Sequence, residues 1–122
     1  MYITENDKIA IRTLVEKQVE AFRKNDLNTA FSLTVFEIQE KLEPDDFMAR
    51  VSEKYYPIVK HKSLMFQGFT LVNDYPALVA MIMDCSGKLI QAIFIVKYQQ
   101  GFGWRICGYE LHSVARKISR SW

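Results

Sequence analysis

A chain of 122 residues, of which 49% are hydrophobic, is long enough for one domain that buries a core without disulfides or bound metals. A net charge of +2 is too small to imply nucleic-acid binding by itself, and two cysteines do not make a disulfide framework. The N-terminus lacks a secretory signal, and no apolar run reaches the roughly 18 residues that span a bilayer. We therefore expect a cytoplasmic protein with free thiols.

The first half of the chain has helical periodicity. Thr4 and Asp7 resemble a capping box with Asp in place of Glu or Gln, and an amphipathic helix should follow. Its buried stripe recurs at three- and four-residue spacing: Ile11, Leu14, Val15, Gln18, Val19 and Phe22. Asp26 is typical of the N-cap of a second, short helix, and a third should begin near Pro44 and end at residues 55–57. This half therefore predicts three helices.

The second half consists of four strand-length segments that are apolar at nearly every position: 64–72, 77–83, 89–98 and 104–111. Short stretches of turn-forming residues separate them. An antiparallel sheet with one wet face should alternate apolar and polar residues, and these segments barely do. The pattern predicts an α+β fold in which helices cover one face of a four-stranded antiparallel meander and a second subunit covers the other.

Two sequence motifs accompany this order of helices and strands. Asn25-Asp26-Leu27 separates the first two helices as an "xxD" break, and Gly103-Trp104-Arg105-Ile106 opens the last strand as a G-W-[RK]-I signature. Together they resemble the nuclear transport factor 2-like (cystatin-like) superfamily, which implies three helices packed on a strongly curved sheet in a cone-shaped fold. That superfold hosts isomerases, dehydratases, hydrolases and binding modules, so the resemblance implies no activity.

A narrower resemblance covers Gln18 to Leu111, most of the chain. It rests on scattered motifs, among them Ala21–Asp26, Tyr56–Val59 and Trp104–Leu111. These are similar to a bacterial family known only as a domain of unknown function. The resemblance supports the architecture and assigns no chemistry.

The facing of the third strand decides which side chains line the cone. If Lys97 faces solvent at the edge of an apolar surface, the alternating residues, including Phe94 and Tyr98, face the interior. Tyr55 and Tyr56 fit either core packing or the pocket mouth. The expected pocket candidates are Tyr55, Tyr56, Phe94, Tyr98, Trp104 and His112.

The opposite face carries a stripe that is too apolar to stay in contact with water. Its expected members are Gln91, Ile93, Ile95, Cys107, Tyr109 and Leu111. We expect a homodimer that forms through this outer face.

Few residues suggest catalysis. Asp84 precedes a turn, where an aspartate commonly caps backbone donors, and His61 lies in a run of lysines that favours a loop residue. His112 is either an exposed histidine at a strand end or an acid or base at the pocket. The sequence has no metal-ligand spacing, phosphate loop or nucleophile elbow, so we expect no metal and no cofactor.

The leading hypothesis is a homodimeric module, either accessory or binding a small apolar ligand in an apolar pocket, formed by residues 1–112 and followed by a basic tail, 113–122. The alternative is a small acid/base enzyme of the isomerase, dehydratase or hydrolase type, acting on an apolar substrate through His112, Tyr56 and Asp84. The tail also fits weak contact with nucleic acid or a membrane, although its three basic residues give no strong signal for either.

Overall fold

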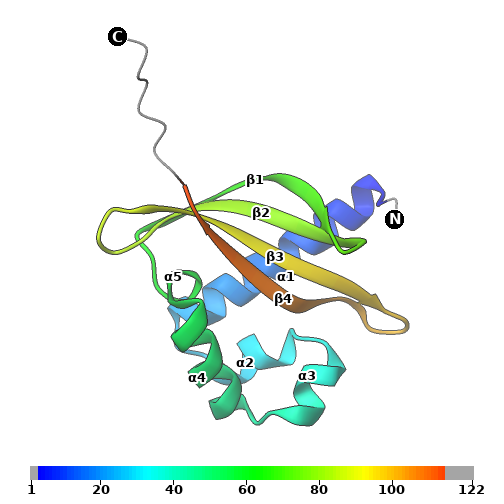
Figure 1. Cartoon of the computed structure of the whole chain (residues 1–122). Helices are drawn as coiled ribbons and strands as arrows, with labels where there is room; N and C mark the ends of the chain where they lie inside the picture. The colour runs from blue at the N-terminus through cyan, green and yellow to red at the C-terminus, as the bar shows by residue number, and fades with distance from the viewer. Residues whose placement is uncertain (1–2, 115–122) are drawn as a thin grey trace.

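The computed structural model describes residues 3–114, in which a set of helices is followed by a four-stranded antiparallel sheet (Figure 1). The helices are α1 (Glu5–Arg23), α2 (Leu27–Ser32), α3 (Phe36–Lys41), α4 (Pro44–Lys54) and α5 (Tyr56–Val59). The strands, which pair in chain order, are β1 (Ser63–Val72), β2 (Tyr75–Met83), β3 (Leu89–Gln99) and β4 (Gly103–Ser113). The α+β class and the meander are confirmed. The predicted basic tail lies, from residue 115 onward, outside the described residues.

The start of α1 follows the predicted capping box. The Thr4 amide donates to the Asp7 carboxylate at 2.9 Å, and the Asp7 amide donates to the Thr4 hydroxyl at 3.1 Å. At the other end, Asn25 has a left-handed φ of 60°, which turns the chain sharply enough for the Asp26 carboxylate to cap α2 through the Thr29 amide at 3.2 Å. The predicted stripe of α1 is buried against the sheet.

Five helices lie within residues 3–114, whereas the sequence predicts three. The additional helices, α3 and α5, have six and four residues and no side-chain N-cap hydrogen bond. Contacts from the sheet hold α3 in place. The Gln99 side chain accepts from the Phe36 amide at 3.1 Å, Lys97 and Glu37 form an ion pair at 3.0 Å, and the Arg105 guanidinium lies 5.2 Å from the Phe36 ring centroid. Tertiary contacts of this kind leave no local sequence signal.

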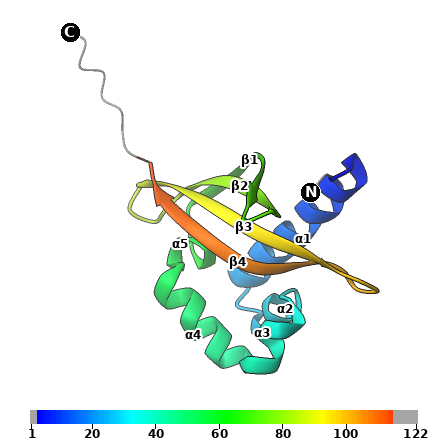
Figure 2. The same ribbon diagram turned by 45° about the vertical axis from the view of Figure 1, so that its right-hand side comes forward.

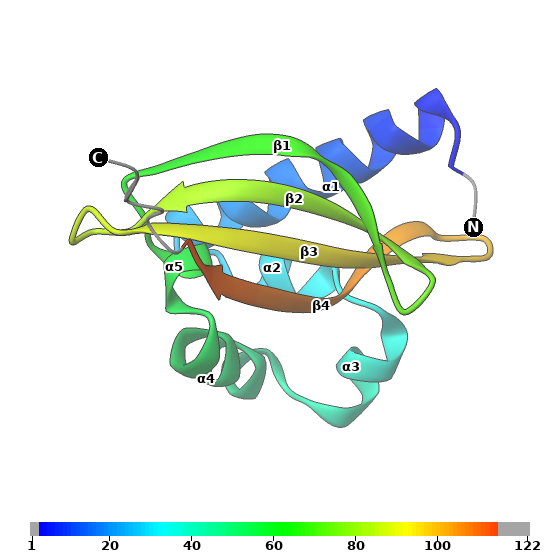
Figure 3. The ribbon, with the colours of Figure 1, turned by 45° about the horizontal axis from the view of Figure 1, so that its top comes forward.

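The helices of the described residues lie on one side of the sheet or beyond its β4 edge (Figures 1 and 2). In Figure 3 the sheet lies in front of α1, and none of these helices crosses the face turned toward the viewer. The core is therefore between the helices and the sheet. Its largest fully buried side chains include Ile11, Ile58, Leu78, Phe94 and Ile106. No helix in this part of the chain is long and apolar enough to cross a membrane.

A β-bulge in β4 places some side chains of this strand on the opposite face of the sheet from the one predicted. Ile95 pairs with Gly108 and Val96 pairs with Ile106, so Cys107 is the extra residue. A shift of one residue moves the following side chains to the other face. Tyr109 and Leu111 therefore join the helix-covered core and do not lie on the outer face, where the strict alternation of the sequence had placed them.

Candidate functional site

The six predicted pocket residues do not gather around one cavity. Phe94 is fully buried and packs edge-on against the Tyr109 ring, with centroids 5.9 Å apart. Tyr55 packs against the same ring at 5.3 Å. These two candidates are core residues, which answers the alternative left open for Tyr55 in favour of packing. Tyr56, in contrast, is half exposed and belongs to a surface groove.

The remaining candidates lie elsewhere. Tyr98 and Trp104 face each other across β3 and β4 with ring centroids 5.4 Å apart, and the Trp104 indole donates to the Asp7 carboxylate at 3.4 Å near the start of α1. His112 is exposed and pairs with Glu110 at 2.9 Å on the helix-free side of β4. Neither group shares a cavity with Tyr56.

The interior behind the sheet is closed by a buried polar pair. The Tyr109 hydroxyl donates to the Gln18 side-chain oxygen at 2.7 Å, and the Gln18 amide group donates to the Ala30 carbonyl at 3.1 Å. Burial raises the pKa of the Tyr109 hydroxyl far above its usual range, so it stays protonated. Every buried side-chain polar atom of the described residues has a partner. The pair is therefore a structural element of the core, in which each buried polar atom has a partner.

Asp84 has the turn role that its position predicts. Its carboxylate accepts from the Ser86 hydroxyl at 2.7 Å and from the amides of Ser86 and Lys88 at 2.9 and 2.8 Å. These hydrogen bonds, above all the one from the Ser86 hydroxyl, lower the pKa of Asp84. A carboxylate used in this way is a poor proton donor near neutral pH.

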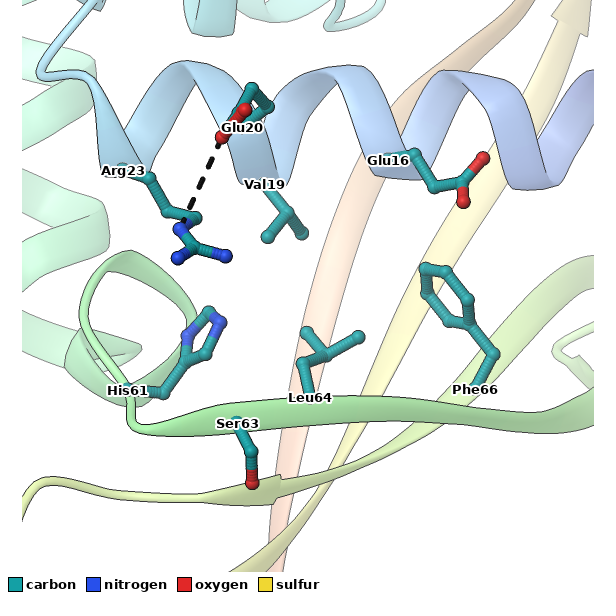
Figure 4. A pocket seen from close by; sticks show the side chains of 8 residues that line it. All are labelled: Glu16, Val19, Glu20, Arg23, His61, Ser63, Leu64 and Phe66. Atoms are coloured by element: carbon teal, nitrogen blue, oxygen red, sulfur yellow. Dashed lines mark ion pairs between the residues drawn. The ribbon is translucent and has the colours of Figure 1, made fainter.

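Polar groups surround a hollow at a place that sequence patterns did not single out. The end of α1, helices α4 and α5, and the start of β1 enclose two adjoining hollows, which share Arg23 and His61. The smaller, about 350 Å³, lies between α1 and β1 (Figure 4) and is called the α1–β1 hollow. The larger, about 570 Å³, is called the basic groove. Its lining is Phe22, Arg23, Lys24, Asn25, Met48, Ser52, Tyr56, Val59, Lys60 and His61.

His61 lies where the two hollows meet. Its Nδ1 is 2.9 Å from the Pro57 carbonyl oxygen, so this nitrogen carries a proton and Nε2 is the accepting atom of the neutral ring. Figure 4 shows the ring directed toward the Arg23 guanidinium, while the Ser63 side chain points away. Arg23 is also within 4.0 Å of Glu20 in an exposed pair. The lysines beside His61 predicted only a loop, and no local signal reports its closeness to α1.

The helix-free side of the sheet is here called the open face. It carries Gln91, Ile93 and Ile95 as predicted, and the bulge residue Cys107, also predicted there, lies near Lys97 of the same face. By register its apolar members also include Met65, Tyr75, Val79, Met81, Met83 and Leu89. Met65 is 69% exposed, Leu89 44% and Tyr75 41%, although these are residues of a kind found in cores. Apolar side chains thus remain in water across several strands.

Residues 3–114 contain no group of three or more His, Cys, Asp or Glu side chains that could hold a metal ion. Cys85 and Cys107 are free thiols. Burial raises the pKa of the Cys107 thiol, which makes it a weak nucleophile.

Comparison with known proteins gives one result. No curated protein and no solved structure matches the chain significantly. The family model described as "Domain of unknown function (DUF4864)" matches residues 4–118. The chain therefore belongs to the DUF4864 family, a family of unknown function.

Proposed function

We propose that the protein is a homodimeric binding or accessory module with the nuclear transport factor 2-like arrangement, in which two copies pack through their open faces. The observation that carries this proposal is the apolar open face, where Met65 remains 69% exposed next to Met81, its partner across β1 and β2. Such a face is unfavourable in water and stable against a complementary surface.

The size of the open face suits a second copy. Strands of nine to eleven residues, spaced about 4.8 Å apart with a rise of about 3.3 Å per residue, give a face of roughly 600 Å² in projection. A standard interface buries about 800 Å² of accessible surface per partner, and a pleated face has more accessible area than its projection. Methionine and tyrosine, prominent here, are enriched at interfaces.

The ligand site proposed with this module is the basic groove and not the interior. Behind the sheet, Phe94 and the hydrogen-bonded pair of Tyr109 and Gln18 fill the space that a cone-shaped pocket would occupy. The groove has an apolar floor beneath polar rims, the general composition of small-molecule sites. The cytoplasmic location stays a prediction.

A second candidate function, acid/base catalysis, is favoured by one observation. The Nδ1 proton of His61 is held by the Pro57 carbonyl, so Nε2 is the ring nitrogen available for proton transfer, beside a hollow lined by Arg23 and Glu20. Asp84 and His112, by contrast, are engaged by local partners. His61→Gln would abolish turnover of any substrate in the catalytic case and would leave the dimer unchanged in both cases.

Sedimentation velocity tests the homodimer. The double variant Met65→Glu/Met81→Glu places two carboxylates in the apolar β1–β2 half of the open face and should convert a dimer to a monomer, because buried unpaired charges are costly. The matched control is Leu71→Glu, an exposed apolar residue of β1 whose alternation directs it to the opposite side. A monomeric parent, or a double variant that remains dimeric, would contradict the proposal.

A further inference from the structure

The basic groove concentrates positive charge in a chain that is almost balanced. The whole sequence has 16 Lys and Arg against 14 Asp and Glu. The groove lining nevertheless contains Arg23, Lys24, Lys60 and the ring of His61, and it contains no acidic residue. Glu20, the partner of Arg23, lines the adjoining α1–β1 hollow and does not line the groove. The groove is therefore a site of positive potential, in which a negative ligand group is favoured.

Helix ends reduce this potential without cancelling it. Lys24 is the C-cap residue of α1, and Lys60 is the C-cap residue of α5. A helix C-terminus carries at most about half a negative charge, and α5 is a single turn with a small dipole. Three permanent cations exceed that charge, so the groove remains positive.

The floor of the groove has a different character from its rim. Phe22 is buried in the core, and Met48 and Val59 are partly buried against it. The hydroxyl groups of Ser52 and Tyr56 also line the groove. The buried and half-buried floor side chains offer apolar contact to an alkyl chain or a small ring, and the exposed Tyr56 ring lies beside them. Positive rim and apolar floor together match a ligand with a charged head and an apolar tail.

We propose that the basic groove binds a small amphiphilic anion, a phosphate monoester or carboxylate with a short apolar tail. The head group is held by Arg23, Lys24 and Lys60, and the tail lies on Phe22, Met48 and Val59. This inference rests on the proposed function only in taking the protein to be a binding module, since the groove does not involve the open face. A groove of about 570 Å³ accommodates a ligand of this size.

Amide-detected NMR titration of the full chain tests the proposal with four probes below their micelle concentrations: octyl phosphate, octanoate, octanol and inorganic phosphate. The two amphiphilic anions should give saturable shifts at the groove amides, around residues 23–25 and 56–61. Octanol lacks the head and inorganic phosphate lacks the tail, so each should bind at least about tenfold more weakly. Tighter binding of octyl phosphate than of octanoate would identify a phosphate ligand, and the reverse order a carboxylate.

Charge-matched variants separate a built site from diffuse attraction. Arg23→Gln/Lys60→Gln should weaken octyl phosphate binding by about tenfold or more, because it removes two direct cations. Arg50→Gln/Lys54→Gln lowers the net charge equally at two exposed α4 positions outside the groove lining and should have little effect. Equal weakening by both pairs, shifts confined to another surface, or no saturable binding would overturn the proposal.

Sedimentation of the same samples keeps this proposal distinct from the proposed dimer. A monomer that binds octyl phosphate in the groove would remove the homodimer and retain the ligand site. A dimer without saturable groove binding would retain the open-face interface and remove the ligand class.

Discussion

The two faces of the sheet are both largely apolar, but the helices of the chain bury only one of them. On the helix-covered face, Leu78, Ala80 and Phe94 are fully buried by the chain itself. On the open face, Met65 and Leu89 remain 69% and 44% exposed. The difference shows that apolar composition marks a face that needs cover but does not say which molecule provides it. The placement of the polar side chains distinguishes a face that the same chain covers from a face that another molecule would cover.

The two faces differ in where their polar side chains lie and in which groups these side chains contact. On the covered face the Tyr109 hydroxyl donates to the side-chain oxygen of Gln18, a residue of α1. On the open face the charged groups, including Lys97, Arg105 and Glu110, lie on or beside the edge strand β4. Charged groups at one border of an otherwise apolar face resemble part of the polar rim of an interface between molecules.

The largest effect is expected from removing a large side chain on the covered face. Phe94→Ala should lower the free energy of unfolding by about 3–5 kcal/mol, because it leaves a cavity among fully buried neighbours. The same truncation on the open face, Met65→Ala, should change it by less than about 0.5 kcal/mol in a dilute, monomeric sample. Urea denaturation at several protein concentrations measures both values. Comparable losses at low concentration would mean that the open face is covered within the monomer.

A smaller loss is expected from the buried polar pair. Tyr109→Phe leaves the Gln18 oxygen buried without a donor and should cost about 1–3 kcal/mol in unfolding free energy. Gln18→Met should also destabilise, since it deprives the Tyr109 hydroxyl and the Ala30 carbonyl of a partner.

A double-mutant cycle decides whether the two residues act as a unit. Tyr109→Phe/Gln18→Met should cost less than the sum of the single variants, with a coupling of about 0.5–3 kcal/mol. If the losses of the two single variants simply add, the hydrogen bond between Tyr109 and Gln18 contributes no coupling energy to the covered face.

The sequence was sufficient for the elements that carry local or periodic signals. The capping box at Thr4 and Asp7, the stripe of α1 and the four strands all follow from spacing and turn residues. Helix α3 was not predictable, since Glu37 and Phe36 are held by side chains of β3 and β4 about 60 residues away. The facing of Tyr109 was missed for a related reason: a one-residue bulge at Cys107 has no reliable local signature.

The candidate site could be predicted from the sequence less well than the fold. The run of lysines around His61 predicted a loop, and no sequence pattern singled out Arg23. Their significance comes from the packing of α1 beside α5, which places these residues around the same groove. Charge clusters that are assembled by tertiary structure from distant segments leave no contiguous pattern. Gln18 did offer a signal, as a polar residue in an otherwise apolar stripe.

The smallest effect we predict concerns acid, and it lies outside both faces. Hydrogen bonds lower the pKa values of Asp7, Asp26 and Asp84, which cap α1, α2 and the β2–β3 turn. A folded-state pKa below the unfolded value means that the unfolded chain binds more protons. The stabilisation is therefore complete above the ordinary pKa of 3.8 and is lost as the pH falls through the lowered values.

Two variants at one cap test this origin. Asp84→Asn removes the titrating group, and Ser86→Ala keeps the carboxylate but removes the hydroxyl that contributes most to its lowered pKa. Both should make the unfolding free energy less sensitive to pH in the acid range, as followed by urea denaturation at a series of pH values. An unchanged slope in both variants would assign the acid sensitivity to other carboxylates. Phe94 and Tyr109 carry no charge in the acid range. Their contribution to the free energy of unfolding should therefore not change with pH, while the contribution of the capping aspartates is lost.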